Sequence, residues 1–138
     1  MALSFQIITP TGIILSEQVE HVYLPGSLGE MGILDHHTPI ITALEPGELR
    51  YTPVGGSEQH LVVGDGYFQA ENDQLLLVTD LALNSEQIDE TSVEKAIATA
   101  QAALKEHEGM TREDQARFEA NLTKQIAILS FKRKKNHL

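Results

Sequence analysis

The sequence predicts an α+β protein in two parts, an N-terminal antiparallel β-sandwich or barrel followed by a C-terminal antiparallel two-helix hairpin. Two observations predict this fold. Up to about residue 80, short runs of β-branched, aromatic and aliphatic residues are separated by Gly, Pro and Asn, with no helical period among them. After Asn84 the apolar residues recur with the period of an α-helix. We therefore expect a β-sandwich domain at residues 1–84 and an αα-hairpin at residues 85–138.

Between six and ten short strands are expected in the first part. Leu3, Phe5 and Ile7 alternate with polar residues and predict the first strand. The other runs with strand character are 19–24, 40–44, 48–52, 59–63, 67–70 and 74–79. Asn72-Asp73 predicts a tight turn between the last two runs. Glycines at 26, 29 and 32 predict a loop with a tight connection, in which they permit positive φ or close backbone approach.

The second part predicts two amphipathic helices. The first has an apolar face made of Val93, Ala96, Ile97, Ala100, Ala103 and Leu104. Gly109 interrupts the pattern, and Thr111 with Asp114 predicts the cap of the next helix. The second apolar stripe consists of Phe118, Leu122, Ile126 and Leu129. Because an alanine-rich face buries little apolar area, we expect the hairpin to dock weakly and to detach while the β-domain stays folded.

Composition and charge exclude several classes of function. The chain has 138 residues, no cysteine and a formal net charge of −10, which excludes disulfides and zinc sites built on cysteine. Residues 1–84 hold one basic residue, Arg50, against eleven acidic ones, which argues against binding nucleic acid or anionic lipid. No apolar run is long enough to span a membrane, so membrane association is expected only through partners.

The basic block Lys132, Arg133, Lys134 and Lys135 stands near the end of the chain. One interpretation is a surface that meets an acidic protein partner. The alternative is a solvated segment whose positive charge simply suits the C-terminal end of a helix.

Catalysis by this chain alone is not expected. The sequence has no nucleophile elbow, no phosphate-binding glycine loop and no dinucleotide fingerprint, so we assign no catalytic residue and no cofactor. His36-His37, with His21 or His60 nearby, leaves a small metal-dependent β-barrel enzyme as a rival interpretation. Adjacent histidines in a strand point to opposite faces, so no metal site is assigned.

Gly29-Glu30-Met31-Gly32-Ile33-Leu34, followed by His37-Thr38-Pro39, resembles the signature of the epsilon subunit of F-type ATP synthases, of the bacterial and chloroplast type. Four further segments agree with that family in order and spacing. They are Thr9-Pro10, Leu44-Glu45-Pro46-Gly47-Glu48-Leu49, Val63-Gly64-Asp65-Gly66-Tyr67 and Leu77-Val78-Thr79-Asp80-Leu81-Ala82.

The resemblance implies a non-catalytic central-stalk (rotor) subunit that couples proton-driven rotation of the membrane ring to ATP synthesis. Glu30 would face the loops of the c-ring, and His37 would lie where the sandwich meets the gamma subunit. The basic block Lys132–Lys135 would reach the alpha/beta catalytic head when the hairpin extends and inhibits ATP hydrolysis. The implied location is the cytoplasmic face of a bacterial plasma membrane, with the stromal face of a thylakoid membrane as the alternative.

The same resemblance bears on nucleotide binding. Family members that bind ATP open their first helix with Ile-Asp-x-x-Arg-Ala, and this chain keeps Ile88 and Asp89 but has Ser92 and Val93 at the Arg and Ala positions. A triphosphate needs cations to offset its charge. A nucleotide sensor therefore stays a rival interpretation, and no ATP is expected to bind.

Overall fold

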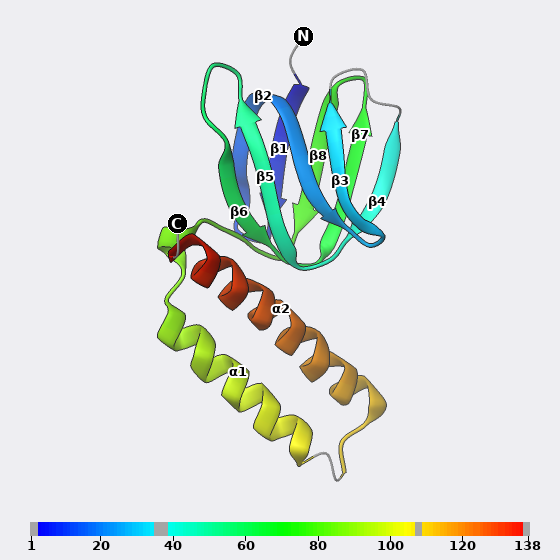
Figure 1. Ribbon diagram of the computed structural model, residues 1–138. Helices are drawn as coiled ribbons and strands as arrows, with labels where there is room; N and C mark the ends of the chain where they lie inside the picture. Colours follow the sequence, from blue (N-terminus) through cyan, green and yellow to red (C-terminus); the bar gives the residue numbers. More distant parts are fainter. Residues whose placement is uncertain (1–2, 35–38, 107–108, 137–138) are drawn as a thin grey trace. The chain divides into compact units, whose positions relative to one another are not determined.

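The computed structural model describes residues 3–34, 39–106 and 109–136 (Figure 1). The chain divides into two units, Met1–Asn84 with the strands and Ser85–Leu138 with the helices. This arrangement confirms the predicted fold class, a β-sandwich followed by a helical hairpin.

The described residues of the first unit form nine strands. These are β1 (Leu3–Thr9), β2 (Gly12–Gly26), β3 (Gly29–Leu34), β4 (Ile40–Leu44), β5 (Gly47–Pro53), β6 (Gln59–Val63), β7 (Gly66–Glu71), β8 (Gln74–Thr79) and β9 (Ala82–Leu83). One layer has the order β1-β8-β7-β4, and the other has β3 and β5 on either side of β2, with β6 and β9 beyond β5. The long strand β2 joins the two layers, because its first half pairs with β1 and its second half with β3 and β5.

The core lies between the two layers. Strand β1 alternates buried and partly exposed residues along its whole length, as a strand with one face on a core should. Phe5 and Phe68 are the largest side chains that are fully buried. The other core residues are Leu3, Ile7, Val19, Val22, Leu24, Ile33, Leu44, Leu49, Tyr51, Val63, Ala70, Leu75, Leu77 and Ala82. All of them belong to the first unit, so this unit has a core of its own.

The turn between β7 and β8 illustrates how the sequence sets the strand register. Asn72 and Asp73 have φ of 51° and 59°, and they connect β7 to β8 as the two-residue turn that the sequence predicts. One pairing departs from the antiparallel expectation, since β1 and β8 are parallel. The two strands are far apart in the chain, so no hairpin forces them to run in opposite directions.

The segment expected as a glycine-rich loop is instead strand β3. Gly26 pairs with Gly29 around the two residues Ser27 and Leu28, so β2 and β3 form a hairpin. Gly29 has a φ of 118°, which a residue with a side chain rarely adopts. The predicted tight connection with positive φ and close approach at these glycines is confirmed, whereas the expectation of a loop as far as Gly32 is wrong, because strand β3 begins at Gly29.

The second unit contains the short 3₁₀ helix η1 (Ser85–Gln87), α1 (Glu90–Lys105) and α2 (Arg112–Asn136), with α1 and α2 antiparallel and side by side (Figure 1). The predicted face of α1 is confirmed, since its six residues are buried or half-buried. The Asp114 backbone N–H donates to the Thr111 hydroxyl at 3.0 Å, which confirms the cap of α2. No helix in the described part of the chain has the length and apolar character to span a membrane.

The apolar stripe predicted to be the buried side of α2 is partly wrong. Phe118 and Ile126 are exposed, at 37% and 45%, whereas Ile128 and Phe131 are buried. The next two residues, Lys132 and Arg133, bond to η1 and α1. The last turns of α2 therefore contact η1 and the start of α1, and the side of α2 that faces inward there differs from the predicted apolar stripe.

Candidate partner-binding surfaces

The β2–β3 hairpin carries the first candidate surface. Its turn residue Leu28 is fully exposed. Glu30 lies on β3 opposite Pro25, and its side chain is 59% exposed. Its carboxylate accepts a hydrogen bond from Arg50 Nη2 at 3.0 Å, so the predicted ring-facing carboxylate is ion-paired to β5.

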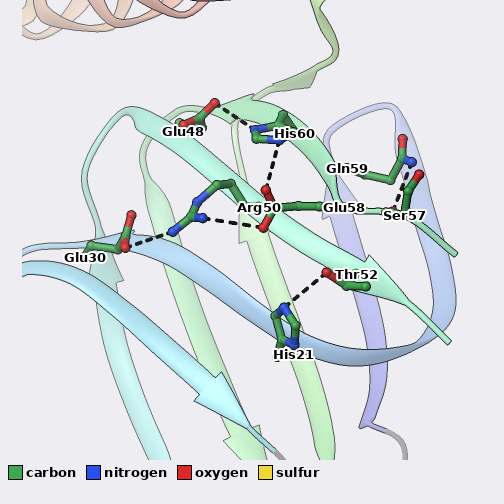
Figure 2. A network of polar contacts seen from close by, with 9 residues as sticks. All are labelled: His21, Glu30, Glu48, Arg50, Thr52, Ser57, Glu58, Gln59 and His60. Carbon is green, nitrogen blue, oxygen red and sulfur yellow. Dashed lines mark hydrogen bonds and ion pairs between the residues drawn. The ribbon is translucent and has the colours of Figure 1, made fainter.

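Arg50 lies at the centre of a polar network on the outer face of β3, β2, β5 and β6 (Figure 2). Its Nη1 donates to Glu58 at 3.4 Å, and its guanidinium lies 4.6 Å from the centre of the Tyr23 ring. The ring nitrogens of His60 lie 3.2 Å from Glu58 and 3.1 Å from Glu48. Sequence reasoning did not single out this network. The available signal was that Arg50 is the one basic residue among the first 84.

The outer face of the other layer carries the second candidate surface, a row of apolar side chains across five strands. The register aligns them directly, and directly opposed residues point to the same face of a sheet. The row consists of Ile13, Ile8, Val78, Tyr67 and Ala43. Ile13 is 62% exposed and Tyr67 is 46% exposed, and Ile41 on the neighbouring row is 72% exposed.

Two hollows lie on the same face of the sheet, one over the apolar row and one over polar side chains. An open hollow of about 480 Å³ lies over Ile8, Pro10, Tyr67 and Val78. Towards the opposite ends of the strands lies a second hollow of about 500 Å³. It is lined mainly by polar side chains, with two leucines, and its residues are Ser4, Gln6, Gln69, Glu71, Asn72, Gln74, Leu75 and Leu76. The face therefore offers apolar contact at one end and hydrogen bonds at the other, as protein interfaces do. Sequence reasoning missed it because the outward residues became visible only once the register was known.

The basic block is the third candidate surface, and it lies within α2 and not after it. Lys132 Nζ donates to the Ser85 carbonyl at 2.8 Å. Arg133 donates to Glu90 through Nε and to Glu94 through Nη2, both at 2.9 Å. These bonds raise the pKa of Arg133 above its usual value. The interpretation as a free solvated tail is therefore wrong for Lys132 and Arg133.

Lys134 and Lys135 complete the block on the last turn of α2. The Lys135 ammonium lies 5.4 Å from the centre of the Phe131 ring. Positive charge at this end of a helix also suits its dipole.

Ile88 and Asp89, the partial match to the ATP motif, open α1. Ile88 is buried, and Asp89 is the N-cap residue, accepting a bond from the Thr91 backbone N–H at 3.1 Å. The Ser92 hydroxyl donates to the other carboxylate oxygen at 2.8 Å, and this bond is the main cause of the lowered pKa of Asp89. Ser92, which stands at the Arg position of the ATP motif, therefore serves the N-terminal cap of α1 by donating to Asp89.

Replacing Ser92 with Ala is expected to raise the pKa of Asp89 towards its ordinary value of 3.8, because the main bond that favours the carboxylate is lost. A depressed carboxyl pKa stabilises the folded state above the unfolded pKa, and this stability is lost as the pH falls through the folded pKa. The variant should therefore keep α1 intact at neutral pH but lose less helix on acidification. NMR titration of the Asp89 carboxyl carbon measures the shift, with Ser130→Ala on α2 as the matched control. An unchanged pKa in the Ser92 variant would contradict this role.

The metal hypothesis rested on His36 and His37, which lie outside the described residues. Within 3–34, 39–106 and 109–136, no group of three or more His, Asp or Glu side chains is arranged to hold a metal ion. His21 and His60 have other partners there, since the Thr52 hydroxyl lies 3.1 Å from His21 Nε2 and His60 lies between two glutamates. The predicted position of His37 at a partner interface stays a prediction.

Comparison with known proteins agrees with this architecture. Residues 2–85 match the family described as ATP synthase, Delta/Epsilon chain, beta-sandwich domain. The ATP synthase epsilon chain of Geobacter metallireducens is 38% identical over 114 residues, which cover 83% of this chain and 80% of the relative. The epsilon chain of Anaeromyxobacter sp. (strain K) is 40% identical over 104 residues, covering 75% of this chain and 78% of the relative.

Two solved structures share the fold. A chain of the Euglena gracilis mitochondrial ATP synthase, in a cryo-EM structure of OSCP, F1 and c-ring, superimposes with a TM-score of 0.78 at 22% identity, over 94% of this chain and 80% of that one. A chain of the central stalk and c-ring structure of the Tetrahymena thermophila mitochondrial ATP synthase gives 0.65 at 8% identity, over 96% and 97% of the two chains. With the family match and the bacterial relatives, the resemblance inferred from the sequence is confirmed. This chain belongs to the ATP synthase epsilon-chain family.

Proposed function

We propose that this chain is a non-catalytic central-stalk subunit of a bacterial F-type ATP synthase. Its β-sandwich binds the gamma subunit and rests on the loops of the c-ring, so that proton-driven rotation of the ring reaches the catalytic head. Its helical hairpin changes between a closed form and an extended form that impedes ATP hydrolysis. The subunit works at the cytoplasmic face of the plasma membrane, peripherally and through its partners.

The apolar row on β2, β1, β8, β7 and β4 carries the proposal of a gamma contact. A contiguous exposed apolar surface on a small protein is typical of a protein–protein interface. The flanking amide groups would satisfy polar groups of the partner and fix its register. A rotor subunit needs such a surface because it must stay attached to the stalk under torque.

The β2–β3 hairpin supports the proposed contact with the ring. It presents an exposed apolar tip, Leu28, beside a carboxylate, Glu30. Polar ring loops with basic side chains would find an acceptor in Glu30 and apolar contact in Leu28. The net charge of −10, concentrated in the first unit, adds a long-range attraction for a basic partner.

Replacing Ile41 with Asp is expected to weaken gamma binding by at least about tenfold, because burial of an unpaired carboxylate in an apolar interface costs more than 1.4 kcal/mol. The matched control is Val54→Asp, since Val54 is 54% exposed but follows β5 in the other layer. Titration of the purified chain into purified gamma subunit measures both affinities. Equal weakening by the two variants, or by neither, would contradict gamma binding at this face.

A further inference from the structure

We propose that Arg50 is a positioning residue for Glu30, holding this carboxylate at the ring-facing hairpin through a clamp formed with Tyr23 and Glu58. The inference rests on the proposed contact between Glu30 and the ring loops. It adds the residues that decide where the carboxylate points, none of which lies in the turn itself.

The clamp spans three strands. Arg50 on β5 pairs with Tyr23 on β2, and Tyr23 pairs in turn with Gly32 on β3. Neighbouring strands lie about 4.8 Å apart, so a side chain on β5 must cross β2 to reach β3. Arg50 does so over the Tyr23 ring, with its guanidinium carbon 4.6 Å from the ring centre. Its Nη2 then reaches the Glu30 carboxylate at 3.0 Å (Figure 2).

The two glycines of the signature acquire separate roles in this geometry. Gly29 lets the chain leave the turn at a φ of 118°, which places Glu30 on the outer face of β3. Gly32 leaves room for the ring, because a Cβ at this position would lie 2.8 Å from Tyr23 Cε1. The Tyr23 ring can therefore lean over β3 and form the platform under the guanidinium. In the spacing Gly-Glu-x-Gly, the first glycine permits the turn and the glutamate supplies the carboxylate. The second glycine leaves space for the Tyr23 ring, over which Arg50 reaches Glu30.

Arg50 suits this position better than Lys would. Its planar fork donates from Nη2 to Glu30 and from Nη1 to Glu58, which lie on opposite sides of it. Glu58 is further held by His60, at 3.2 Å. The clamp therefore anchors the exposed Glu30 to the β5–β6 hairpin.

An NMR measurement on the full-length chain tests the positioning. Arg50→Gln and Arg50→Lys are both expected to let the Glu30 side chain populate several χ1 rotamers, read from its Hα–Hβ couplings. Tyr23→Leu should have the same effect, whereas Tyr23→Phe keeps the ring and should leave Glu30 fixed. Glu71 on β7 serves as the internal reference in each variant. A single Glu30 rotamer in Arg50→Gln would overturn the clamp.

A double-mutant cycle on the assembled enzyme tests the link to function. The readout is the number of protons pumped per ATP hydrolysed in membrane vesicles. Glu30→Gln and Arg50→Gln should each lower this ratio, and the double variant should be no worse than Glu30→Gln alone, because Arg50 acts through Glu30. A fully additive loss would overturn the positioning role, since Arg50 would then act by another route. If Glu30→Gln leaves coupling intact, the proposed ring contact fails, and the NMR result still decides whether Arg50 positions the side chain.

Discussion

Removal of residues 85–138 is expected to raise ATP hydrolysis by the assembled enzyme while leaving assembly and ATP synthesis largely intact. The physical reason is the division of the chain into two units. Every core residue of the β-sandwich lies between Leu3 and Ala82, and the two proposed contact regions, the apolar row for gamma and the β2–β3 hairpin for the ring, lie in the same unit. The helical unit contributes none of them, so its loss should remove only the inhibitory element.

The size of the effect depends on how strongly the extended hairpin is favoured in the enzyme. An inhibited state favoured by about 1.4 kcal/mol leaves roughly one enzyme in ten active, so deletion would then raise hydrolysis about tenfold. ATPase assays on membranes, with quantification of bound gamma and catalytic subunits, measure activity and assembly together. Urea unfolding of the 1–84 fragment provides the control that the β-sandwich folds alone. Failure of the enzyme to assemble would contradict the assignment of all attachment to the first unit.

Much of the fold could be predicted because the determining interactions are local or periodic. The alternation of β1, the turn at Asn72 and Asp73 and the apolar face of α1 all follow from spacing along a short stretch of chain. Strand β3 was missed because two of its residues, Gly29 and Gly32, carry no side chain to show alternation. Gly29 is explained by the turn that it ends, and Gly32 by Tyr23 on the neighbouring strand β2.

The candidate sites were harder to predict because they depend on contacts distant in sequence. Glu30 could be named from its motif, but its partner Arg50 is 20 residues away. The apolar row needs the register of four strand pairs before its members can be recognised as neighbours. The inward side of α2 was mispredicted because the residues that the helix contacts are distant in sequence, as the bonds from Lys132 to Ser85 and from Arg133 to Glu90 across 47 and 43 residues show. An apolar pattern read along one helix contains no information on such contacts.

The double replacement Glu90→Gln and Glu94→Gln is expected to strengthen inhibition of ATP hydrolysis. In the closed hairpin Arg133 is bound to both carboxylates, at 2.9 Å each, and these bonds tie the end of α2 to the start of α1. In the proposed extended form the same basic residue turns to an acidic surface of the catalytic head. The two sets of contacts exclude each other, so weakening the first favours the second. We therefore expect the variant to populate the extended form severalfold more and to hydrolyse ATP correspondingly more slowly.

Because the chain has no cysteine, a labelled pair can be introduced cleanly at Thr99 on α1 and Asn121 on α2, both of which are exposed. Electron–electron distance measurements between spin labels there report how far the hairpin opens in the enzyme.

The control is the double variant Glu106→Gln with Glu113→Gln, which changes the net charge by the same amount as Glu90→Gln with Glu94→Gln. Glu113 is about 30 Å along α2 from Arg133, so this pair should leave the closed form unchanged. Arg133→Ala removes the bonds of the closed form together with one contact of the extended form, so it should shift the balance between the two forms less than the Glu90 and Glu94 variant does. Faster hydrolysis in the Glu90 and Glu94 variant than in the unmodified enzyme would show that these carboxylates support the inhibited state, and the proposed competition for Arg133 would then be wrong.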